Sequence, residues 1–251
     1  AKLDILWLRP ENDFLPDLKE LESMLRPNTK LVVLNNPNNP TGALLMGPNL
    51  EEFVAVVRSS GAYILCDEVY RGTNQVGNGF APAMADIYEK GISVSSMSKV
   101  FSLAGIRLGW IVAPREVLEA VSIRRDYNTI SVGMIDDYFA SLALENKEKI
   151  IGRSQKITRG NLKILDDWVS KERSISYKKP QAGTTALLKY DFDIPSREFC
   201  IQLLRETGVM FTPGSVMEME GWLRIGYANS PEVLSQGLDL VSNFLLQMGS
   251  R

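Results

Sequence analysis

The chain has 251 residues, 45% of them hydrophobic and 23% charged, which suits one large globular domain or two modest ones. The formal net charge of −2 provides no general attraction to nucleic acid or to an anionic membrane, and we expect neither as a partner. Histidine is absent, which excludes Ser-His-Asp and Cys-His catalysis and histidine-based metal sites, and we expect no bound metal.

The first half of the chain alternates short apolar runs with helical patterns. Strands are predicted at residues 4–8, 30–36, 62–70, 91–99 and 107–114, and helices at residues 15–25 and 50–60. This rhythm predicts an α/β fold with a mostly parallel sheet and flanking helices. Such sheets bind ligands at the carboxyl ends of their strands, so polar residues that follow the strands are candidate site residues.

The second half opens with a helical pattern over residues 115–144 and one long amphipathic helix over residues 146–172, which Gly152 and Gly160 weaken. The remaining predicted elements are strands at 175–180, 184–192, 209–213 and 222–228, a helix at 197–207 capped by Ser196, and a last helix from Pro231. We therefore expect a large domain at 1–145, a connecting helix at 146–172 and a smaller α+β domain at 173–251.

The two cysteines, Cys66 and Cys200, each lie in an apolar run. We expect buried free thiols in a reducing compartment, with a disulfide between them as the alternative. No run approaches the length of a membrane span, and the first residues lack the apolar core and cleavage site of a signal peptide. A cytoplasmic protein that does not enter the membrane is the resulting expectation.

Two polar clusters follow predicted strands. Residues 35–42 read NNPNNPTG, in which two Asn-Pro steps and a glycine force a turn. Asp67 directly follows the apolar run AYILC, where a half-buried carboxylate is costly without a partner. The structural alternatives are a stiff turn and a surface carboxylate, whereas the functional interpretation of Asp67 is an anion that holds a proton on a ring nitrogen.

A third cluster combines hydroxyls, a lysine and an arginine around a glycine-containing turn. It runs through SSMSKVF, residues 95–101, and AGIRLGW, residues 104–110. Hydroxyls and a guanidinium can bind one phosphate through charge-assisted hydrogen bonds. Lys99 can act as a Schiff-base nucleophile if its neighbours and its burial lower its pKa, and a solvated lysine is the structural alternative.

In order and spacing, these three clusters resemble the class I/II aminotransferases, pyridoxal-phosphate enzymes of fold type I with the aspartate aminotransferase fold. The resemblance runs over nearly all of the chain and includes the arginine of WLRIGYA, Arg224. It implies pyridoxal 5′-phosphate as cofactor and three catalytic residues. Lys99 holds the cofactor as a Schiff base, Asp67 pairs with the pyridine nitrogen, and Tyr70 donates to the phenolic oxygen.

The remaining site residues are also assigned by this resemblance. Asn39 is a second donor to the phenolic oxygen and lies in the substrate site, and Val69 packs under the cofactor ring. The phosphate ligands are Ser96 and Arg107, with a further contact from Ser98. Arg224 clamps the substrate α-carboxylate, a task suited to a bidentate guanidinium.

By resemblance, the function is transfer of an amino group from an L-amino acid to a 2-oxo acid, in amino-acid metabolism, by a homodimer. One alternative is other pyridoxal-phosphate chemistry on an amino acid, by a C–S or β-elimination lyase or by an oxidase or hydroxylase acting on a basic amino acid. Another is the cofactor-sensing effector domain of a transcription regulator, which the intact asparagine-proline turn and the absence of a helix-turn-helix pattern disfavour.

The chain departs from the family pattern in two places. The family has an N-terminal segment before the strand that leads into the Asn-Pro turn, and these 251 residues do not include it. We therefore expect the large domain to be incomplete, with exposed strand edges, low solubility and weak cofactor binding when the chain is expressed alone. Residues 181–185, QAGTT, lack the aromatic that many members carry there, which leaves the substrate side chain open.

Overall fold

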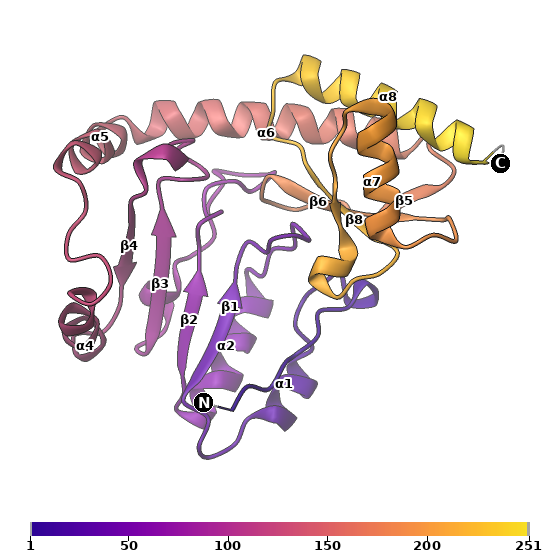
Figure 1. Cartoon of the computed structure of the whole chain (residues 1–251). Coiled ribbons are helices and arrows are strands. Elements are labelled where there is room, and N and C mark those ends of the chain that lie inside the picture. The colour runs from indigo at the N-terminus through magenta and orange to yellow at the C-terminus, as the bar shows by residue number, and fades with distance from the viewer. Residues whose placement is uncertain (1, 250–251) are drawn as a thin grey trace. The chain divides into compact units, whose positions relative to one another are not determined.

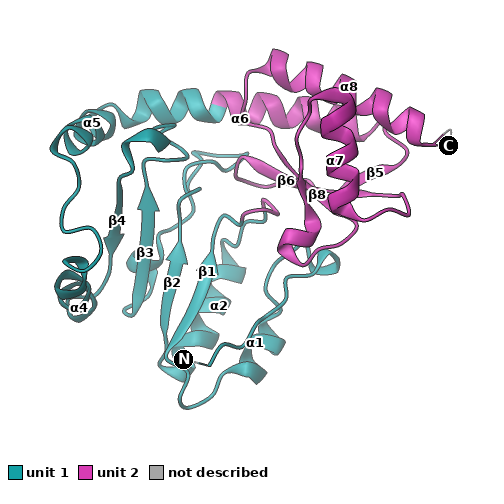
Figure 2. Cartoon of the chain, in the orientation of Figure 1, with its two compact units in different colours: residues 1–38, 43–155 teal, residues 39–42, 156–251 magenta. Residues whose placement is uncertain are grey.

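The computed structural model describes residues 2–249, which form two compact units (Figures 1 and 2). Unit 1 comprises residues 1–38 and 43–155, and unit 2 comprises residues 39–42 and 156–251. The boundary falls inside the long helix α6 (Lys147–Val169), which is continuous through both of its glycines. The expected three-part domain division stays a prediction.

Unit 1 contains a four-stranded sheet in the order β1-β2-β3-β4 (Figure 1). Its strands are β1 (Leu31–Asn35), β2 (Tyr63–Asp67), β3 (Gly91–Ser96) and β4 (Gly109–Val112). The first three strands are parallel, and β4 runs antiparallel to β3. The predicted α/β fold with a mostly parallel sheet is therefore confirmed.

Helices α1 (Leu18–Met24) and α2 (Pro48–Ser60) contact each other, and α2 supplies much of the unit 1 core. The Asp17 side chain caps α1 by accepting hydrogen bonds from two backbone N–H groups of the first turn. Three more helices complete the unit: α3 (Met84–Ile87), α4 (Arg115–Arg125) and α5 (Met134–Glu145). Short 3₁₀ helices are η1 (Pro10–Asn12) and η2 (Ala104–Ile106).

Two predictions for unit 1 are wrong. Residues 4–8 are not a strand, because apolar composition alone does not provide a neighbouring strand to complete the hydrogen bonds, and none pairs with them in the described part of the chain. The helical run over 115–144 is broken at 126–133, where asparagine, threonine, serine and glycine are poor helix formers and Ile130 has a positive φ of 58°.

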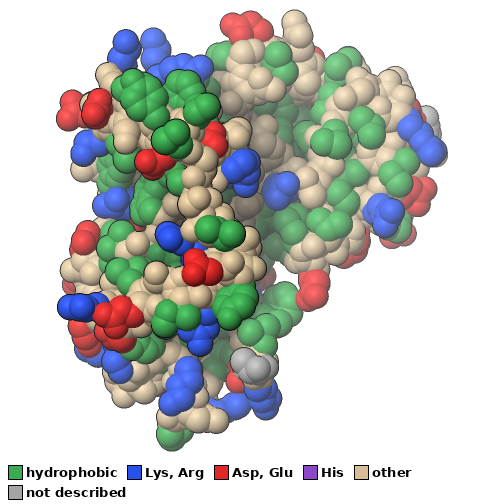
Figure 3. All heavy atoms as spheres, turned by 60° about the vertical axis from the view of Figure 1, so that its left-hand side comes forward, with side chains coloured by type: hydrophobic (Ala, Val, Ile, Leu, Met, Phe, Trp, Pro, Cys, Tyr) green, Lys and Arg blue, Asp and Glu red, His purple; other side chains and the backbone are tan. Residues whose placement is uncertain are grey.

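Apolar side chains are exposed on the α4 and α5 side of unit 1, which Figure 3 turns forward. Helix α4 contains no buried residue, and its Ile123 is 69% exposed. Strands β1 and β4 are the two edges of the sheet, and Val33 and Val112 point apolar side chains to solvent there. Exposed apolar side chains therefore lie on the α4 and α5 side and at both edges of the sheet.

Unit 2 has an antiparallel sheet in the order β5-β6-β8-β7. Its strands are β5 (Ile175–Tyr177), β6 (Thr185–Tyr190), β7 (Thr212–Pro213) and β8 (Trp222–Gly226), and its other elements are α7 (Ser196–Thr207), η3 (Gly214–Met217) and α8 (Pro231–Gly249). Ser196 does not cap α7 as predicted, because it is the first residue of the helix. Instead, the backbone N–H and the hydroxyl of Ser196 both donate hydrogen bonds to the Glu220 carboxylate.

Cys66 and Cys200 are both buried free thiols, as expected, and burial raises the pKa of each. Among residues 2–249, no helix combines the length and the apolar composition needed to cross a bilayer.

The buried face of α7 provides a stability prediction. Leu203 is fully buried in the unit 2 core, whereas its neighbour Leu204 is 44% exposed. Leu203→Ala should lower the free energy of unfolding by about 2–5 kcal/mol, because it removes apolar contacts and leaves a cavity. Leu204→Ala, the matched control, should cost well under half as much. Urea unfolding of both variants measures the difference, and equal losses would contradict this core assignment.

Candidate active site

The three polar clusters predicted from sequence meet the sheet of unit 1 on one side, where the parallel strands β1, β2 and β3 end. We call this side the carboxyl edge of the sheet. Strand β2 ends at Asp67, which lies opposite Val94 of the parallel strand β3, and β3 ends at Ser96. Strand β4 runs back from this edge, since Gly109 pairs with Ser96. Segment 67–70 therefore leaves the carboxyl end of β2, segment 95–99 leaves the carboxyl end of β3, and segment 107–109 leads into the amino end of β4. These three strand ends are neighbours.

Two asparagines fix the turn after β1 to this edge. Asn36 is buried, and its amide donates to the Leu45 carbonyl at 2.8 Å and accepts from the Leu45 N–H at 2.9 Å. The Asp67 carbonyl accepts from Asn35 Nδ2 and from the Asn36 N–H, both at 3.0 Å. Both Asn-Pro bonds in this turn are cis. The sequence predicted a stiff turn, but it did not indicate that Asn35 and Asn36 hold the end of β2.

The Asp67 side chain is half-buried at the end of β2. Its Oδ1 accepts a hydrogen bond from the Val69 N–H at 3.0 Å, and within the described ranges its side chain makes no other hydrogen bond. Val69 is also half-buried. The carboxylate is thus oriented by the backbone and retains an oxygen that can accept from a ligand N–H.

The neighbouring acid, Glu68, is buried and points into the protein. Its Oε1 accepts from the Met84 N–H at 2.6 Å and from Ser93 Oγ at 2.7 Å, so it joins β2 to β3 and to the first residue of α3. Desolvation raises the pKa of Glu68 above its ordinary value. No pattern in the sequence indicated this structural task for Glu68.

Lys99 and Tyr70 lie together. Lys99 Nζ is 5.6 Å from the centre of the Tyr70 ring, within the range of a cation–π contact. Tyr70 is only 3% exposed, but the Lys99 side chain is exposed. Lys99 is exposed because it sits in the turn beyond the last residue of β3, and its role as the Schiff-base lysine stays a prediction.

The turn from β3 to β4 gathers the predicted anion ligands. It is closed by backbone hydrogen bonds from Met97 to Leu108 at 3.0 Å and from Leu103 to Met97 at 2.9 Å. Ser96 Oγ accepts from the Ser98 N–H at 3.2 Å and keeps its own hydrogen for donation.

Arg107 lies in the same turn. It is exposed, and its Nη1 donates to the Ala104 carbonyl at 2.7 Å. In the described part of the chain, no carboxylate pairs with its guanidinium. The positive charge of Arg107 is therefore available to a ligand anion.

The other two predicted site residues, Asn39 and Arg224, belong to unit 2. The Asn39 carboxamide accepts from Thr185 Oγ1 at 3.5 Å, and the Gly42 carbonyl accepts from the N–H groups of residues 181 and 182 at 2.8 and 3.1 Å. Arg224 on β8 is half-buried, and its Nη2 donates to Thr212 Oγ1 at 3.2 Å. Among residues 2–249, no acid pairs with Arg224.

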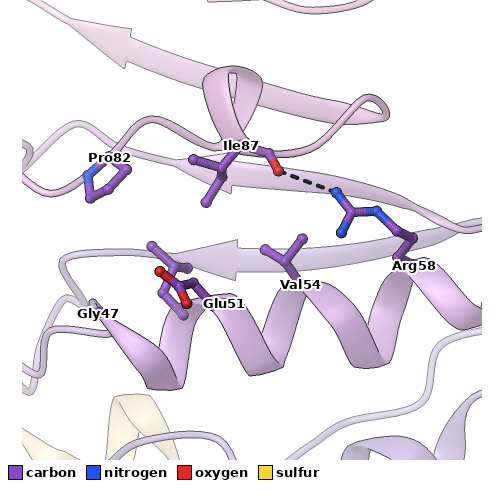
Figure 4. Close-up of a pocket in the computed structure, with 7 residues that line it drawn as sticks. Gly47, Glu51, Val54, Arg58, Pro82 and Ile87 are labelled. Carbon is purple, nitrogen blue, oxygen red and sulfur yellow. Dashed lines mark hydrogen bonds between the residues drawn. The ribbon is translucent and has the colours of Figure 1, made fainter.

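A cavity of about 180 Å³ in unit 1 is separate from these residues (Figure 4). It lies between α2 and the segment around α3, and its lining includes Leu50, Val54 and Ile87. Arg58 at its side donates to the Ile87 carbonyl at 3.3 Å and pairs with Glu89. No predicted site residue lines this cavity, so we do not assign the chemistry to it.

The side chains fit the cofactor that the sequence resemblance implies. An amine suits an aldehyde, a backbone-oriented carboxylate suits a protonated ring nitrogen, and hydroxyls with an unpaired guanidinium suit a phosphate. Lys99, Asp67, Ser96 and Arg107 provide these groups at one sheet edge. An α/β unit that presents these groups together is typical of an enzyme that depends on a bound cofactor.

Comparison with known proteins gives the family. The family model described as "Aminotransferase class I and II" matches residues 2–239, and the chain belongs to this family. Capreomycidine synthase of Streptomyces vinaceus is 30% identical over 239 residues, covering 95% of this chain and 61% of that protein. Aspartate aminotransferase of Thermotoga maritima is 29% identical, covering 93% of this chain and 60% of that protein.

The solved structure of a PLP-dependent aminotransferase from Streptococcus suis 89-1591 superimposes with a TM-score of 0.95 at 42% identity. The match covers 99% of this chain and 66% of that one. The chain thus spans about three fifths of the length of the curated relatives it matches.

Burial of Glu68 leads to a pH-dependence prediction. Because its folded-state pKa is raised, Glu68 favours folding while it is protonated, and this contribution is lost as pH rises from the ordinary glutamic acid pKa, about 4.3, through the raised value. Glu68→Gln keeps an acceptor oxygen for Ser93 and Met84 but cannot ionise. The free energy of unfolding of the variant relative to wild type should therefore increase between about pH 4 and about pH 8.

Urea unfolding at the two pH values measures this difference for both proteins. The other carboxyl groups titrate equally in both and cancel in the comparison. A difference that stays constant between the two pH values would show that the Glu68 charge is not desolvated in the folded protein.

Proposed function

We propose that the protein is a pyridoxal-phosphate-dependent aminotransferase that moves an amino group from an L-amino acid to a 2-oxo acid. The observation that carries this proposal is the placement of Lys99, Asp67 and Arg107 on three neighbouring strand ends of one sheet. Membership of the class I and II aminotransferase family supports it independently. A homodimer in the cytoplasm is part of the same proposal.

Each ligand group of the cofactor has an assigned partner. Lys99 Nζ binds the aldehyde carbon covalently, and the Asp67 carboxylate holds the proton on the ring nitrogen. Tyr70 and Asn39 donate to the phenolic oxygen, and Val69 packs against the ring face. Ser96, Ser98 and Arg107 bind the phosphate, which suits two hydroxyls and a guanidinium without an acidic partner.

When bound, pyridoxal phosphate draws electrons from the substrate α-carbon and so acidifies its C–H bond. With the cofactor bound, Lys99 Nζ would take that proton as general base and return it as general acid. Asp67 maintains the ring nitrogen in its protonated state throughout. The Lys99 amine lies 5.6 Å from the centre of the Tyr70 ring, so the two side chains assigned to the aldehyde and the phenolic oxygen are neighbours.

Arg224 is assigned to the substrate α-carboxylate. Its hydrogen bond to Thr212 orients the guanidinium without neutralising it, so a bidentate contact with a carboxylate remains available. A carboxylate fixed in this way would orient the substrate α-carbon so that its C–H bond is the one presented for reaction. That orientation favours removal of the proton over loss of carbon dioxide.

A second candidate is another reaction on an amino acid with the same cofactor. It is favoured by one observation, that a relative at 30% identity is named a synthase rather than an aminotransferase. Assays of keto-acid formation with and without an amino acceptor separate the two, because only transamination requires the acceptor.

Covalent attachment at Lys99 is the first test. The full-length protein is loaded with pyridoxal phosphate, reduced with borohydride and digested. Peptide mapping should place the pyridoxyl group on Lys99, and Lys99→Ala should abolish the label. Lys90, which donates to the Gly61 carbonyl near the start of β3, provides the matched control, and Lys90→Ala should leave the label unchanged. A label on a different lysine would refute the proposed role.

Substitution of Arg224 tests the carboxylate clamp. Arg224→Lys keeps the charge but loses the bidentate fork, and kcat/KM for the amino-acid substrate should fall by about 10- to 100-fold because binding and orientation are both lost. The absorption spectrum of the bound cofactor should stay the same. If the variant instead loses affinity for pyridoxal phosphate at unchanged kcat/KM, Arg224 is a cofactor ligand or a structural residue.

A further inference from the structure

The segment that follows Tyr70, which we call the 71–81 loop, is fixed by its own hydrogen bonds. Thr73 Oγ1 and the Thr73 N–H both donate to the Tyr70 carbonyl, at 2.5 and 3.1 Å. Arg71 Nε donates to the Ala81 carbonyl at 2.8 Å, which closes the base of the loop. The loop is therefore attached directly to the backbone of Tyr70.

One side chain from outside the loop holds it in place. Gln155, on the unit 1 part of α6, donates from Nε2 to the Gly72 carbonyl and to the Asn78 carbonyl, both at 3.0 Å. Gly79 leaves the room for this amide, because a Cβ at Gly79 would lie 2.0 Å from Gln155 Nε2. An amide nitrogen has two hydrogens to donate, and these two carbonyls match them, so a carboxylate in the same place could not do so.

The same loop contacts the turn that carries Lys99. Gly72 approaches the buried side chain of Val100 so closely that a Cβ there would lie 2.9 Å from Val100 Cγ2. Val100 directly follows Lys99, and Tyr70 directly precedes the loop. Both members of the pair at 5.6 Å are thus joined to the loop that Gln155 holds.

We propose that Gln155 is a positioning residue for Lys99 and Tyr70. By holding the 71–81 loop against Val100, it fixes the distance between the lysine amine and the tyrosine ring, and it touches neither the cofactor nor the substrate itself. This inference rests on the proposed function of Lys99. A misplacement of about 1 Å can slow a step that depends on the position of an amine by up to about 100-fold.

The test compares three variants of the full-length protein: Gln155→Glu, Gln155→Ala and the control Gln202→Ala. Gln155→Glu is isosteric and loses both donors. Gln202 belongs to unit 2, where its amide donates a hydrogen bond to Glu198 on α7. The measurements are the rate at which pyridoxal phosphate becomes attached to Lys99, followed by borohydride trapping and mapping, and the pH at which the visible absorbance of the bound cofactor changes.

We expect both Gln155 variants to slow attachment by about tenfold and to shift the pH midpoint of the absorbance change, while Gln202→Ala retains the wild-type values. Thermal unfolding gives the folded fraction of each sample. A loss of rate that only follows the folded fraction, or wild-type rate and midpoint in Gln155→Glu, would overturn the positioning role alone. Absence of the label from Lys99 in the wild-type protein would overturn the proposed function and this inference together.

Discussion

Parallel pairing of β1, β2 and β3 is the constraint on which the rest of the site depends. In a parallel arrangement all carboxyl ends lie at one edge, so residues that are distant in sequence become neighbours without any loop having to reach across the sheet. The register of Asn35 with Asp67, and of Asp67 with Val94, sets this edge. A slip of one residue in β2 would exchange the faces of Asp67 and Glu68 and place the wrong carboxylate at the surface.

Buried polar groups destabilise a fold unless they are hydrogen-bonded. Behind the polar residues at the carboxyl ends of the strands, this protein has a set of buried polar residues that all make hydrogen bonds. Asn36, Glu68 and Thr73 are all buried, and each makes hydrogen bonds at 2.5–2.9 Å with backbone or hydroxyl groups. None of these three residues is proposed to contact the cofactor or the substrate. Each is joined instead to Asp67 or Tyr70, through the backbone or through direct sequence adjacency. The hydrogen bonds that offset the cost of burial therefore also order the residues that are proposed to face a ligand.

Much of unit 1 could be predicted because it depends on local signals, and signals of the same kind indicated candidate site residues, whose roles stay predictions. Apolar runs of strand length marked β1, β2 and β3, and residue types at fixed spacings marked Lys99 and Asp67. The errors arose where the deciding contact is distant. Residues 4–8 have strand composition but no partner strand, and Gln155 meets Gly72 across 83 positions of sequence, which no local pattern encodes.

Arg107 and Arg224, one in each unit and both proposed as ligands of an anion, illustrate how a protein keeps a positive charge available. Arg9 and Arg58 pair with carboxylates, which offset their charge. Arg107 is held by a carbonyl oxygen and Arg224 by a hydroxyl oxygen, both neutral acceptors. A neutral acceptor orients the guanidinium and leaves its full charge for a ligand anion, whereas a carboxylate would compete with that anion for the same donors. With 30 acids against 28 bases in the chain, such arginines require acids to be absent from their immediate surroundings, which is a local property that the net charge does not reveal.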